Sequence, residues 1–273
     1  MNSTLSVAVL SGKGGVGKTN LTLNLAFALY DDGFKSLLLD CDMGLANLDV
    51  LLGITPEGNI QDVLLGEADI HSVLHSVKPN ALDVLPAASG VPEINDLSPD
   101  KRELLVSRLA PLLGKYDFVF MDIGAGISDT VQTFAAMAAM RVVVITPEPT
   151  SLTDSYALIK VLNKRFGLSD FRVVVNEVTS TKEARGAYDK LAGACKHFLN
   201  IDLQLLGHVR MDRKLAEAVC KQQPLMAYAP SSPAAQDIRA MASKLQSSRL
   251  AMLDWLSQHP ILLAIPQANS REQ

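Results

Sequence analysis

Residues 12–19 read GKGGVGKT, and their glycines, lysines and threonine suit the binding of a phosphate chain. Every fixed position of the pattern GxxxxGK[ST] is filled. Glycines let consecutive backbone N–H groups turn inward around phosphate oxygens, because no Cβ stands in the way. In such a loop Lys18 reaches the β- and γ-phosphates, and the Thr19 hydroxyl coordinates Mg²⁺. The candidate nucleotide-binding residues of this stretch are Gly12, Lys13, Gly14, Gly15, Val16, Gly17, Lys18, Thr19 and Asn20.

The flanking residues provide the context that this loop requires. The apolar run LSVAVL precedes it and the helical pattern NLTLNLAFAL follows, so the loop joins a strand to a helix. The N-terminus of that helix adds N–H donors and a partial positive charge. A glycine-rich turn without a ligand is the alternative, and the strand-loop-helix context speaks against it. The stretch therefore predicts a site for a nucleoside triphosphate with Mg²⁺.

Three carboxylates stand at the ends of two later apolar runs. Asp40 and Asp42 end the run LLLDCD, and Asp122 ends FVFMD. Open α/β sheets bind ligands at the carboxyl ends of their strands, which places these acids beside the glycine loop. An acid such as Asp122 can hold Mg²⁺ through a water molecule. Acids that only cap a strand-to-loop turn are the alternative for Asp40 and Asp42.

Short apolar runs alternate with stretches of helical periodicity along the chain. Most runs are unbroken in Val, Leu, Ile and Phe, which is typical of strands covered on both faces. Strands are expected at residues 5–10, 36–39, 82–85, 118–121, 142–145, 172–175 and 203–209. Helices are expected at residues 20–30, 99–113, 129–140, 153–166, 182–198 and 213–221. This order predicts a single α/β domain of the P-loop NTPase type, with a mostly parallel sheet of seven or eight strands and helices on both faces.

Composition and charge narrow the class of protein. The 273 residues carry a net charge of -4, which offers no general attraction to nucleic acid, so direct nucleic-acid binding is not expected. Cys41, Cys195 and Cys220 lack a CxxC spacing and fit free thiols in a reducing compartment. The first residues do not read as a signal peptide, and the apolar runs are too short to span a bilayer. We expect a cytoplasmic protein.

The glycine loop resembles the signature KGGxGK[ST] of the deviant Walker A ATPases, the ParA/MinD superfamily. Its distinguishing residue is Lys13, which lies too early in the loop to share the task of Lys18. The resemblance implies a homodimer that sandwiches two ATP molecules, with Lys13 stabilising charge on the partner's nucleotide as an arginine finger does. An ordinary solvated lysine is the alternative. The resemblance also implies a Mg²⁺ shell of Thr19, Asp40 and Asp122, and catalytic roles for Lys13, Lys18 and Asp42, of which Asp42 positions the attacking water.

Two further segments are candidates for contact with the base. The run FRVVVNEV places Asn176 at a strand end, where members of this superfamily hydrogen-bond adenine. The GTP-specific pattern NKxD is incomplete after Asn163 and Lys164, so ATP is favoured over GTP. The segment HVRMDRKLAEAV resembles the loop on the other side of the base. Its candidates are Arg210, Met211 and Asp212, although Asp212 fits a helix cap equally well.

Other stretches resemble the flagellar branch of the superfamily, called FlhG or FleN. They are DMGLANLDVLLG (42–53), PAASG (86–90), DIGAGISD (122–129) and, most specifically, PEPTSLTDSYALIKVLN (147–163). The resemblance implies an ATPase that limits flagellar number. In polar-flagellate members it does so by antagonising a FleQ-like AAA+ enhancer-binding activator; an FlhF-like GTPase or flagellar switch proteins are further partners. The DQAxxLR motif associated with FlhF is missing, which favours the FleN-like role.

The C-terminal part raises the question of membrane contact. We expect residues 1–245 to form the ATPase domain and residues 246–273 an amphipathic helix and tail. Apolar residues recur there at helical spacing, widened near the end, namely Ile238, Met241, Leu245, Leu250, Met252, Leu253, Trp255 and Leu256. One interpretation is weak, ATP-dependent binding peripherally at the inner membrane or the cell pole. The other is a terminal helix docked on the domain.

Two related classes stay open beside the flagellar one. A MinD-like organiser of the division site or pole would bind membrane strongly. A ParA-like partition ATPase would bind DNA in its ATP state in a salt-sensitive manner.

Overall fold

Every residue of the four central strands is buried, as expected of unbroken apolar runs covered on both faces. The computed structural model describes residues 2–42, 47–87 and 99–265. The strands are β1 (Leu5–Leu10), β2 (Ser36–Cys41), β3 (His75–Lys78), β4 (Leu82–Leu85), β5 (Phe118–Ile123), β6 (Met140–Ile145), β7 (Arg172–Val178) and β8 (Gln204–Arg210). They form one sheet of order β3-β4-β2-β5-β1-β6-β7-β8, in which β3 alone runs antiparallel to its neighbour.

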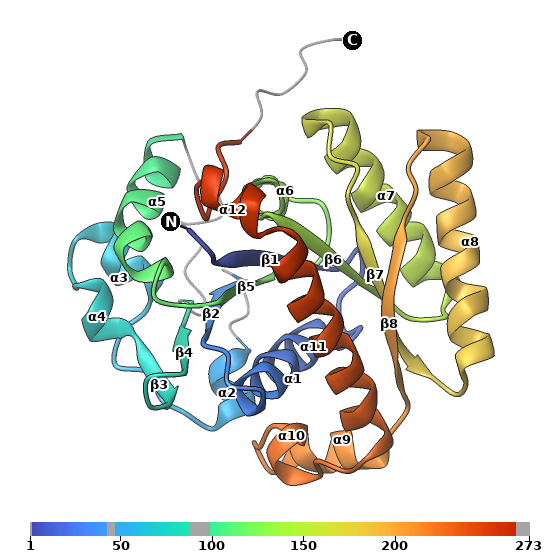
Figure 1. The fold of residues 1–273 in the computed structure, drawn as a ribbon, viewed down its shortest axis with the longest axis horizontal. Helices are drawn as coiled ribbons and strands as arrows, with labels where there is room; N and C mark the ends of the chain where they lie inside the picture. The colour runs from blue at the N-terminus through green and yellow to red at the C-terminus, as the bar shows by residue number, and fades with distance from the viewer. Residues whose placement is uncertain (1, 43–46, 88–98, 266–273) are drawn as a thin grey trace.

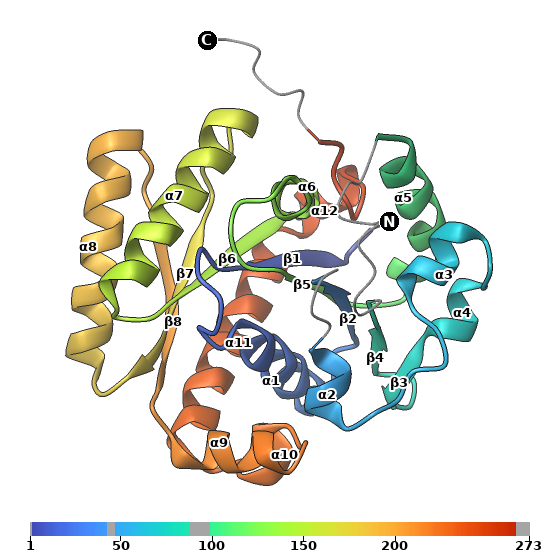
Figure 2. The same ribbon diagram turned by 180° about the vertical axis from the view of Figure 1, so that it is seen from behind.

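Helices cover both faces of this sheet (Figures 1 and 2), and each layer packs its own core. One layer contains α1 (Lys18–Asp31), α10 (Leu225–Tyr228) and α11 (Pro233–Ala251). The other contains α3 (Ile60–Leu65), α4 (Ile70–Val73), α5 (Pro99–Leu113), α6 (Asp129–Met137), α7 (Pro149–Phe166) and α8 (Thr181–Leu199). Three short helices complete the fold, α2 (Leu48–Leu52), α9 (Arg213–Cys220) and α12 (Leu253–Gln258). The expected fold class, a mostly parallel sheet between two helical layers, is confirmed.

The differences from the expected elements lie in short or polar segments. Strand β3 has the sequence HSVK and is only partly buried, so neither an apolar run nor a clear alternation marks it. Helices α2, α3, α4 and α10 have four to six residues, too few for helical periodicity to be recognised. The helix expected to reach residue 140 ends at Met137, because Met140 already begins the buried strand β6.

The C-terminal apolar stripe is packed against the domain. Ile238, Met241 and Leu245 of α11 are buried in the same core as α1, and Leu256 of α12 is buried as well. Of the two interpretations left open for this stripe, the structure has the helix docked on the domain, and the boundary predicted at residue 246 falls inside α11. Leu250 and Trp255 are exposed, by 61% and 36%. In the part of the chain that the structure describes, no helix is long and apolar enough to cross a membrane.

Beyond α12 the chain returns to the start of the sheet. The side chain of Ser6 in β1 donates a hydrogen bond to the carbonyl oxygen of Ile261 at 2.6 Å. The backbone N–H of Leu263 donates to the carbonyl oxygen of Met137 at 2.8 Å, and Leu262 is buried. Residues 259–263 thus cover the edge where β1 begins, while residues 266–273 of the expected tail lie outside the described residues.

Candidate nucleotide-binding site

The glycine loop joins the end of β1 to α1, and its glycines serve different needs. Gly15 and Gly17 have φ of +78° and +82°, a left-handed conformation that favours glycine. A Cβ on Gly12 would lie 2.2 Å from the carbonyl carbon of Asp154 in α7, so the loop can approach that helix only without a side chain. At Gly14 a Cβ would meet no described atom within 4 Å, which leaves that face of the loop open to a ligand.

Lys18 and Asp122 form a buried ion pair at the base of the loop. The Lys18 Nζ atom lies 2.8 Å from Oδ1 of Asp122, and both side chains are less than one-tenth exposed. Among the described residues nothing donates a hydrogen bond to the other oxygen, Oδ2, although it is buried. A buried carboxylate oxygen without a donor is costly unless a cation or water satisfies it, so the pair points to a missing ligand of that kind.

Asp40 lies beside Asp122, because β2 and β5 pair in parallel with these two residues in register. Its carboxylate accepts hydrogen bonds from the backbone N–H groups of Asp42 at 3.0 Å, Asn47 at 3.2 Å and Leu48 at 3.4 Å. Burial, reinforced by the nearby charge of Asp122, nevertheless raises the pKa of Asp40 to about 7. A hard divalent cation prefers carboxylate oxygens as ligands, and it would offset the repulsion between these two adjacent buried carboxylates.

These residues fit Mg²⁺ in chemistry and in number. Asp40 and Asp122 supply carboxylate oxygens, and Thr19 at the first turn of α1 lines the cavity next to the loop. Mg²⁺ keeps several waters and is held by one or two carboxylates together with phosphate oxygens, which matches such an incomplete protein shell. Thr19, Asp40 and Asp122 are the residues that would hold the ion, whose role when bound is to neutralise phosphate charge.

A cavity of about 1200 Å³ opens above the loop, at the carboxyl ends of β1, β7 and β8. It contains most of the candidate residues from the sequence. Gly14 to Asn20, Asp42, Asn176, Arg210, Met211 and Asp212 all line it. Gly12, Lys13, Asp40 and Asp122 lie outside its lining, Asp40 and Asp122 because they are buried.

Asn176 is held against the loop in one orientation. Its side-chain Nδ2 donates to the carbonyl oxygen of Val16 at 2.8 Å, and a Cβ on Gly17 would lie 2.3 Å from this nitrogen. Oδ1 is then available to accept a hydrogen bond from a ligand in the cavity, and Nδ2 keeps a second N–H. An acceptor at this place suits the exocyclic amine of adenine, the base predicted from the sequence.

The other three base candidates have structural roles in addition to lining the cavity. Arg210 is bound to Asp237 of α11 through Nε–Oδ2 and Nη2–Oδ1 distances of 2.8 and 2.9 Å. Asp212 caps α9 by accepting from the backbone N–H of Lys214 at 2.9 Å, so the helix-cap interpretation holds for it. Met211 is 66% exposed and offers an apolar surface.

Lys13 is directed to the first turn of α7. Its Nζ atom lies 2.5 Å from Oε2 of Glu148 and 3.2 Å from Oγ1 of Thr150, and its side chain is 39% exposed. Glu148 and Thr150 were not among the residues predicted for the site, although both lie in the stretch PEPTSLTD that carries the flagellar resemblance. The sequence signal for this contact was an acid and a hydroxyl residue in that stretch, which are suitable partners for a lysine of the glycine loop.

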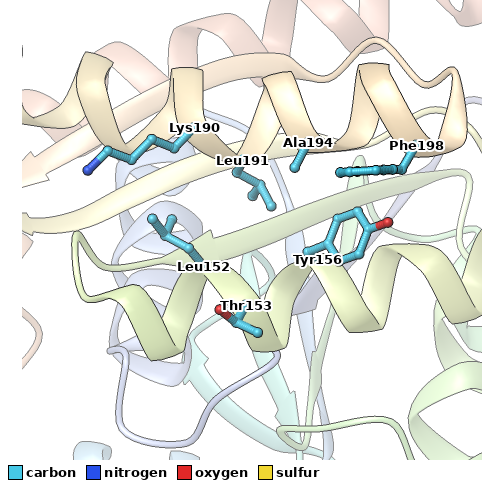
Figure 3. Close-up of a pocket in the computed structure, with 7 residues that line it drawn as sticks. All are labelled: Leu152, Thr153, Tyr156, Lys190, Leu191, Ala194 and Phe198. Carbon is cyan, nitrogen blue, oxygen red and sulfur yellow. The ribbon is translucent and has the colours of Figure 1, made fainter.

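A second hollow, of about 430 Å³, lies between α7 and α8 (Figure 3). Tyr156 and Phe198 face each other at one end, and Lys190 extends along the other (Figure 3). The remaining lining residues are Leu152, Thr153, Leu191 and Ala194. Most of the candidate site residues therefore line the larger cavity, and this groove is a separate feature of the α7–α8 surface.

A strand, a glycine loop and a helix, with a buried lysine–aspartate pair at the end of the neighbouring strand, define the protein as a P-loop NTPase. Comparison with known proteins gives the family. A family model described as ParA, NUBPL iron-transfer P-loop NTPase, matches residues 2–246. The chain belongs to the ParA/MinD family of P-loop NTPases.

Individual relatives confirm the resemblance to the flagellar branch. The chain is 40% identical over 247 residues to the antiactivator FleN of Pseudomonas aeruginosa, covering 90% of this chain and 88% of the relative. It is 34% identical to the flagellum site-determining protein YlxH of Helicobacter pylori, covering 90% and 83%. Among solved structures, the septum site-determining protein MinD of Pyrococcus horikoshii, complexed with Mg-ADP, superposes with a TM-score of 0.74 at 27% identity, covering 90% and 97%.

Proposed function

We propose that this protein is an ATP-dependent dimeric switch with slow ATPase activity that regulates flagellar number by antagonising a FleQ-like AAA+ transcription activator. The observation that carries the ATPase part is the buried cluster of Lys18, Asp122 and Asp40 at the floor of the cavity. The regulatory part rests on the 40% identity to a protein named for antiactivation. The second relative, named for determining the flagellum site, supports the same assignment.

Binding of the triphosphate requires Lys18 to change partners. Its ammonium contacts Asp122 at 2.8 Å, and a phosphate oxygen competes with that carboxylate for the same charge. Asp122, released from Lys18, would hold Mg²⁺ together with Asp40 and Thr19, and the ion would neutralise phosphate charge. The backbone N–H groups of the glycine loop and of the α1 N-terminus hold the remaining phosphate oxygens. Oδ1 of Asn176 accepts from the adenine amine.

Hydrolysis involves two residues beside this core. Asp42 lies close to the segment that follows Asp122, since a Cβ on Gly124 would be 3.3 Å from its Oδ1. In this position Asp42 orients the attacking water. Lys13 is exposed, lies outside the lining of its own cavity, and can leave Glu148 to reach the nucleotide of a second monomer. Hydrolysis then resets the switch and ends dimerisation.

The test is a comparison of two variants as bait. Asp42→Ala loaded with ATP is expected to be dimeric and slow to hydrolyse, whereas Lys18→Ala is expected to be monomeric. Both are used to capture proteins from the host's lysate, followed by mass spectrometry. Specific enrichment of an enhancer-binding activator on Asp42→Ala supports the proposal. Enrichment of a MinE-like or partition protein without that activator contradicts the flagellar assignment but leaves the ATP switch intact.

Purified components make the same test quantitative. The activator's ATPase activity and promoter-dependent transcription are measured against increasing concentrations of the wild-type protein, with ATP or ADP. Inhibition is expected with ATP and not with ADP, and Lys18→Ala is the matched control. An FlhF-like GTPase or a flagellar switch protein replaces the activator in a parallel assay, since these are the other partners of the flagellar branch.

We place the protein in the cytoplasm, with membrane contact restricted to a small surface. The buried stripe of α11 leaves Leu250 and Trp255 as the exposed apolar residues of this region. Two residues give weak, reversible binding at best, because stable anchoring needs a second signal. Liposome sedimentation with ATP or ADP, using Trp255→Ala as the comparison, measures this contact. Equal sedimentation of all samples argues against a membrane role.

A further inference from the structure

The loop after α9 is connected to α2 by a hydrogen bond between residues 172 positions apart. The side-chain Nε2 of Gln222 donates to the backbone carbonyl oxygen of Val50 at 3.0 Å. Val50 belongs to α2, and Gln222 lies two residues after the end of α9. Figure 2 shows α2 near the α9–α10 region. We call this contact the Gln222–Val50 bridge.

The backbone on both sides is adapted to the bridge. Gln222 has φ +51°, a left-handed conformation that costs a non-glycine residue on the order of 1 kcal/mol or more. On the opposite side Gly53 ends α2 at φ +63°, and a Cβ there would approach Cβ of Gln222 to 3.3 Å. A strained glutamine facing a glycine is the arrangement expected where two segments must approach closely.

The bridge joins two helices that both line the nucleotide cavity. Val50 and Leu51 of α2 form one part of its wall, and Leu215 and Val219 of α9 form another. Val50 is 59% exposed and Val219 is 39% exposed, so these apolar side chains present their surface to the cavity rather than to a core. The bridge therefore restrains the separation of two helices that line the nucleotide cavity.

Each of these helices is held at its N-terminus by a different part of the site. The N-terminus of α2 is held by Asp40, whose carboxylate accepts from the N–H groups of Asn47 and Leu48. The N-terminus of α9 is capped by Asp212, which lines the base side of the cavity. The bridge thus connects the acid assigned to the Mg²⁺ shell with the base side.

We infer that Gln222 is a positioning residue that holds α2 against α9, slows nucleotide release, and makes that release depend on Mg²⁺. This inference rests on the proposed nucleotide site. Gln222 does not touch the reacting atoms; it acts through Val50 and α2. Asp40, which holds the start of α2, would also hold Mg²⁺, so a restraint on Asp40 would reach α9 through α2 and the bridge. Without the bridge, α9 and α2 separate independently of Mg²⁺.

The experiment is stopped-flow release of fluorescent mant-ADP from the full chain, chased with excess ADP, with Mg²⁺ and with EDTA. Three variants are compared with the wild type: Gln222→Ala, Gln222→Gly and Gln223→Ala. Gln223 is an exposed neighbour and is the matched control. We expect Gln222→Ala and Gln222→Gly to release mant-ADP about 3- to 10-fold faster with Mg²⁺, the range for one lost hydrogen bond. Their ratio of rates with EDTA and with Mg²⁺ is expected to be smaller than that of the wild type.

Gln222→Gly separates positioning from stability. Glycine adopts the left-handed backbone without strain, so this variant is expected to melt at the same or a higher temperature while releasing nucleotide faster. Release at the wild-type rate from Gln222→Ala overturns the inference and leaves the proposed function standing. Faster release from Gln222→Ala with normal release from Gln222→Gly also overturns it. A wild-type protein that binds no mant-ADP refutes the proposed site itself.

Discussion

The ammonium of Lys18 and the carboxylate of Asp122 are each other's counterion, 2.8 Å apart and buried at the end of two neighbouring strands. One residue is assigned to phosphate and the other to Mg²⁺. Their pairing means that the charges needed for the nucleotide are also needed for the stability of the floor of the site. Binding and stability are therefore expected to respond together when either residue is changed.

Lys18→Ala is expected to abolish ATP binding and to destabilise the fold. The substitution leaves Asp122 as a buried charge without its partner, which typically costs about 3–5 kcal/mol. The double variant Lys18→Ala/Asp122→Asn removes the stranded charge and is expected to regain most of that stability but no ATP binding. Urea unfolding and equilibrium binding of mant-ATP measure the two effects. Equal stability of the single and double variants contradicts a role for the pair in the fold.

Asp40 is expected to make stability depend on pH. Its pKa of about 7 in the folded protein lies above its ordinary value of 3.8, so the folded state binds the proton more tightly than the unfolded state. The free energy of unfolding contributed by this group is highest at acid pH and is lost as the pH rises from about 4 to about 7. The difference between the two pKa values corresponds to at most on the order of 4 kcal/mol.

Urea unfolding of the wild type and Asp40→Asn, without nucleotide and Mg²⁺, measures this contribution. Asparagine has no such titration, so the stability of Asp40→Asn relative to the wild type is expected to increase between pH 5 and pH 8. The difference in the free energy of unfolding between the two proteins cancels the contribution of other titrating groups. A difference that stays constant over this range means that Asp40 has an ordinary pKa.

Lys13→Ala is expected to uncouple binding from hydrolysis. Both side chains of the Lys13–Glu148 ion pair are exposed, and such pairs contribute about 0–1 kcal/mol to the free energy of unfolding. The melting temperature and ATP affinity of the monomer are therefore expected to stay near those of the wild type, while ATP hydrolysis falls by a factor of 10³ or more, as for an arginine finger. Phosphate release and analytical ultracentrifugation with ATP provide the measurements. Normal hydrolysis by Lys13→Ala contradicts its action across the dimer.

Gly12→Ala and Gly14→Ala are a matched pair within the loop. A Cβ at position 12 meets the backbone of α7 at 2.2 Å, whereas at position 14 it meets no described atom within 4 Å. Gly12→Ala is expected to lower the free energy of unfolding by about 1–3 kcal/mol or more, because helix backbone must shift. Gly14→Ala is expected to fold like the wild type. Thermal melts of both proteins decide the question, and equal melting temperatures contradict the close loop–α7 contact.

The central fold could be predicted because its strands are buried on both faces. Short unbroken apolar runs such as Val142 to Ile145, separated by stretches of helical periodicity, indicate buried strands of a parallel sheet. The strand HSVK could not be found in this way, since among the described strands it pairs only with β4 and contributes a single apolar side chain, Val77, to the core. The short α2 and α10 depend similarly on tertiary contacts that are not encoded in local periodicity.

The nucleotide site was predictable where chemistry requires fixed spacing, as between Gly12 and Thr19. Sequence spacing could not show that Lys13 contacts Glu148, because the two residues are 135 positions apart. They come together only because β1 and β6, the strands that precede them, are neighbours in the sheet. The apolar stripe from Ile238 to Leu256 illustrates the opposite case. Its periodicity predicts a helix with one apolar face equally well for a membrane and for a core, and only the packing against α1 distinguishes them.

The hydrogen bonds of residues 259–263 have a consequence for how the chain is made. Ser6 is synthesised 255 residues before its partner Ile261. Asn2 likewise donates to the carbonyl oxygen of His259, and the guanidinium of Arg249 contacts the carbonyl oxygen of Ser3. During synthesis β1 can pair with β5 and β6, but its beginning stays uncovered until residues 259–263 have been made. This part of the sheet is therefore completed late in the folding of the domain, when residues 259–263 close over the start of β1.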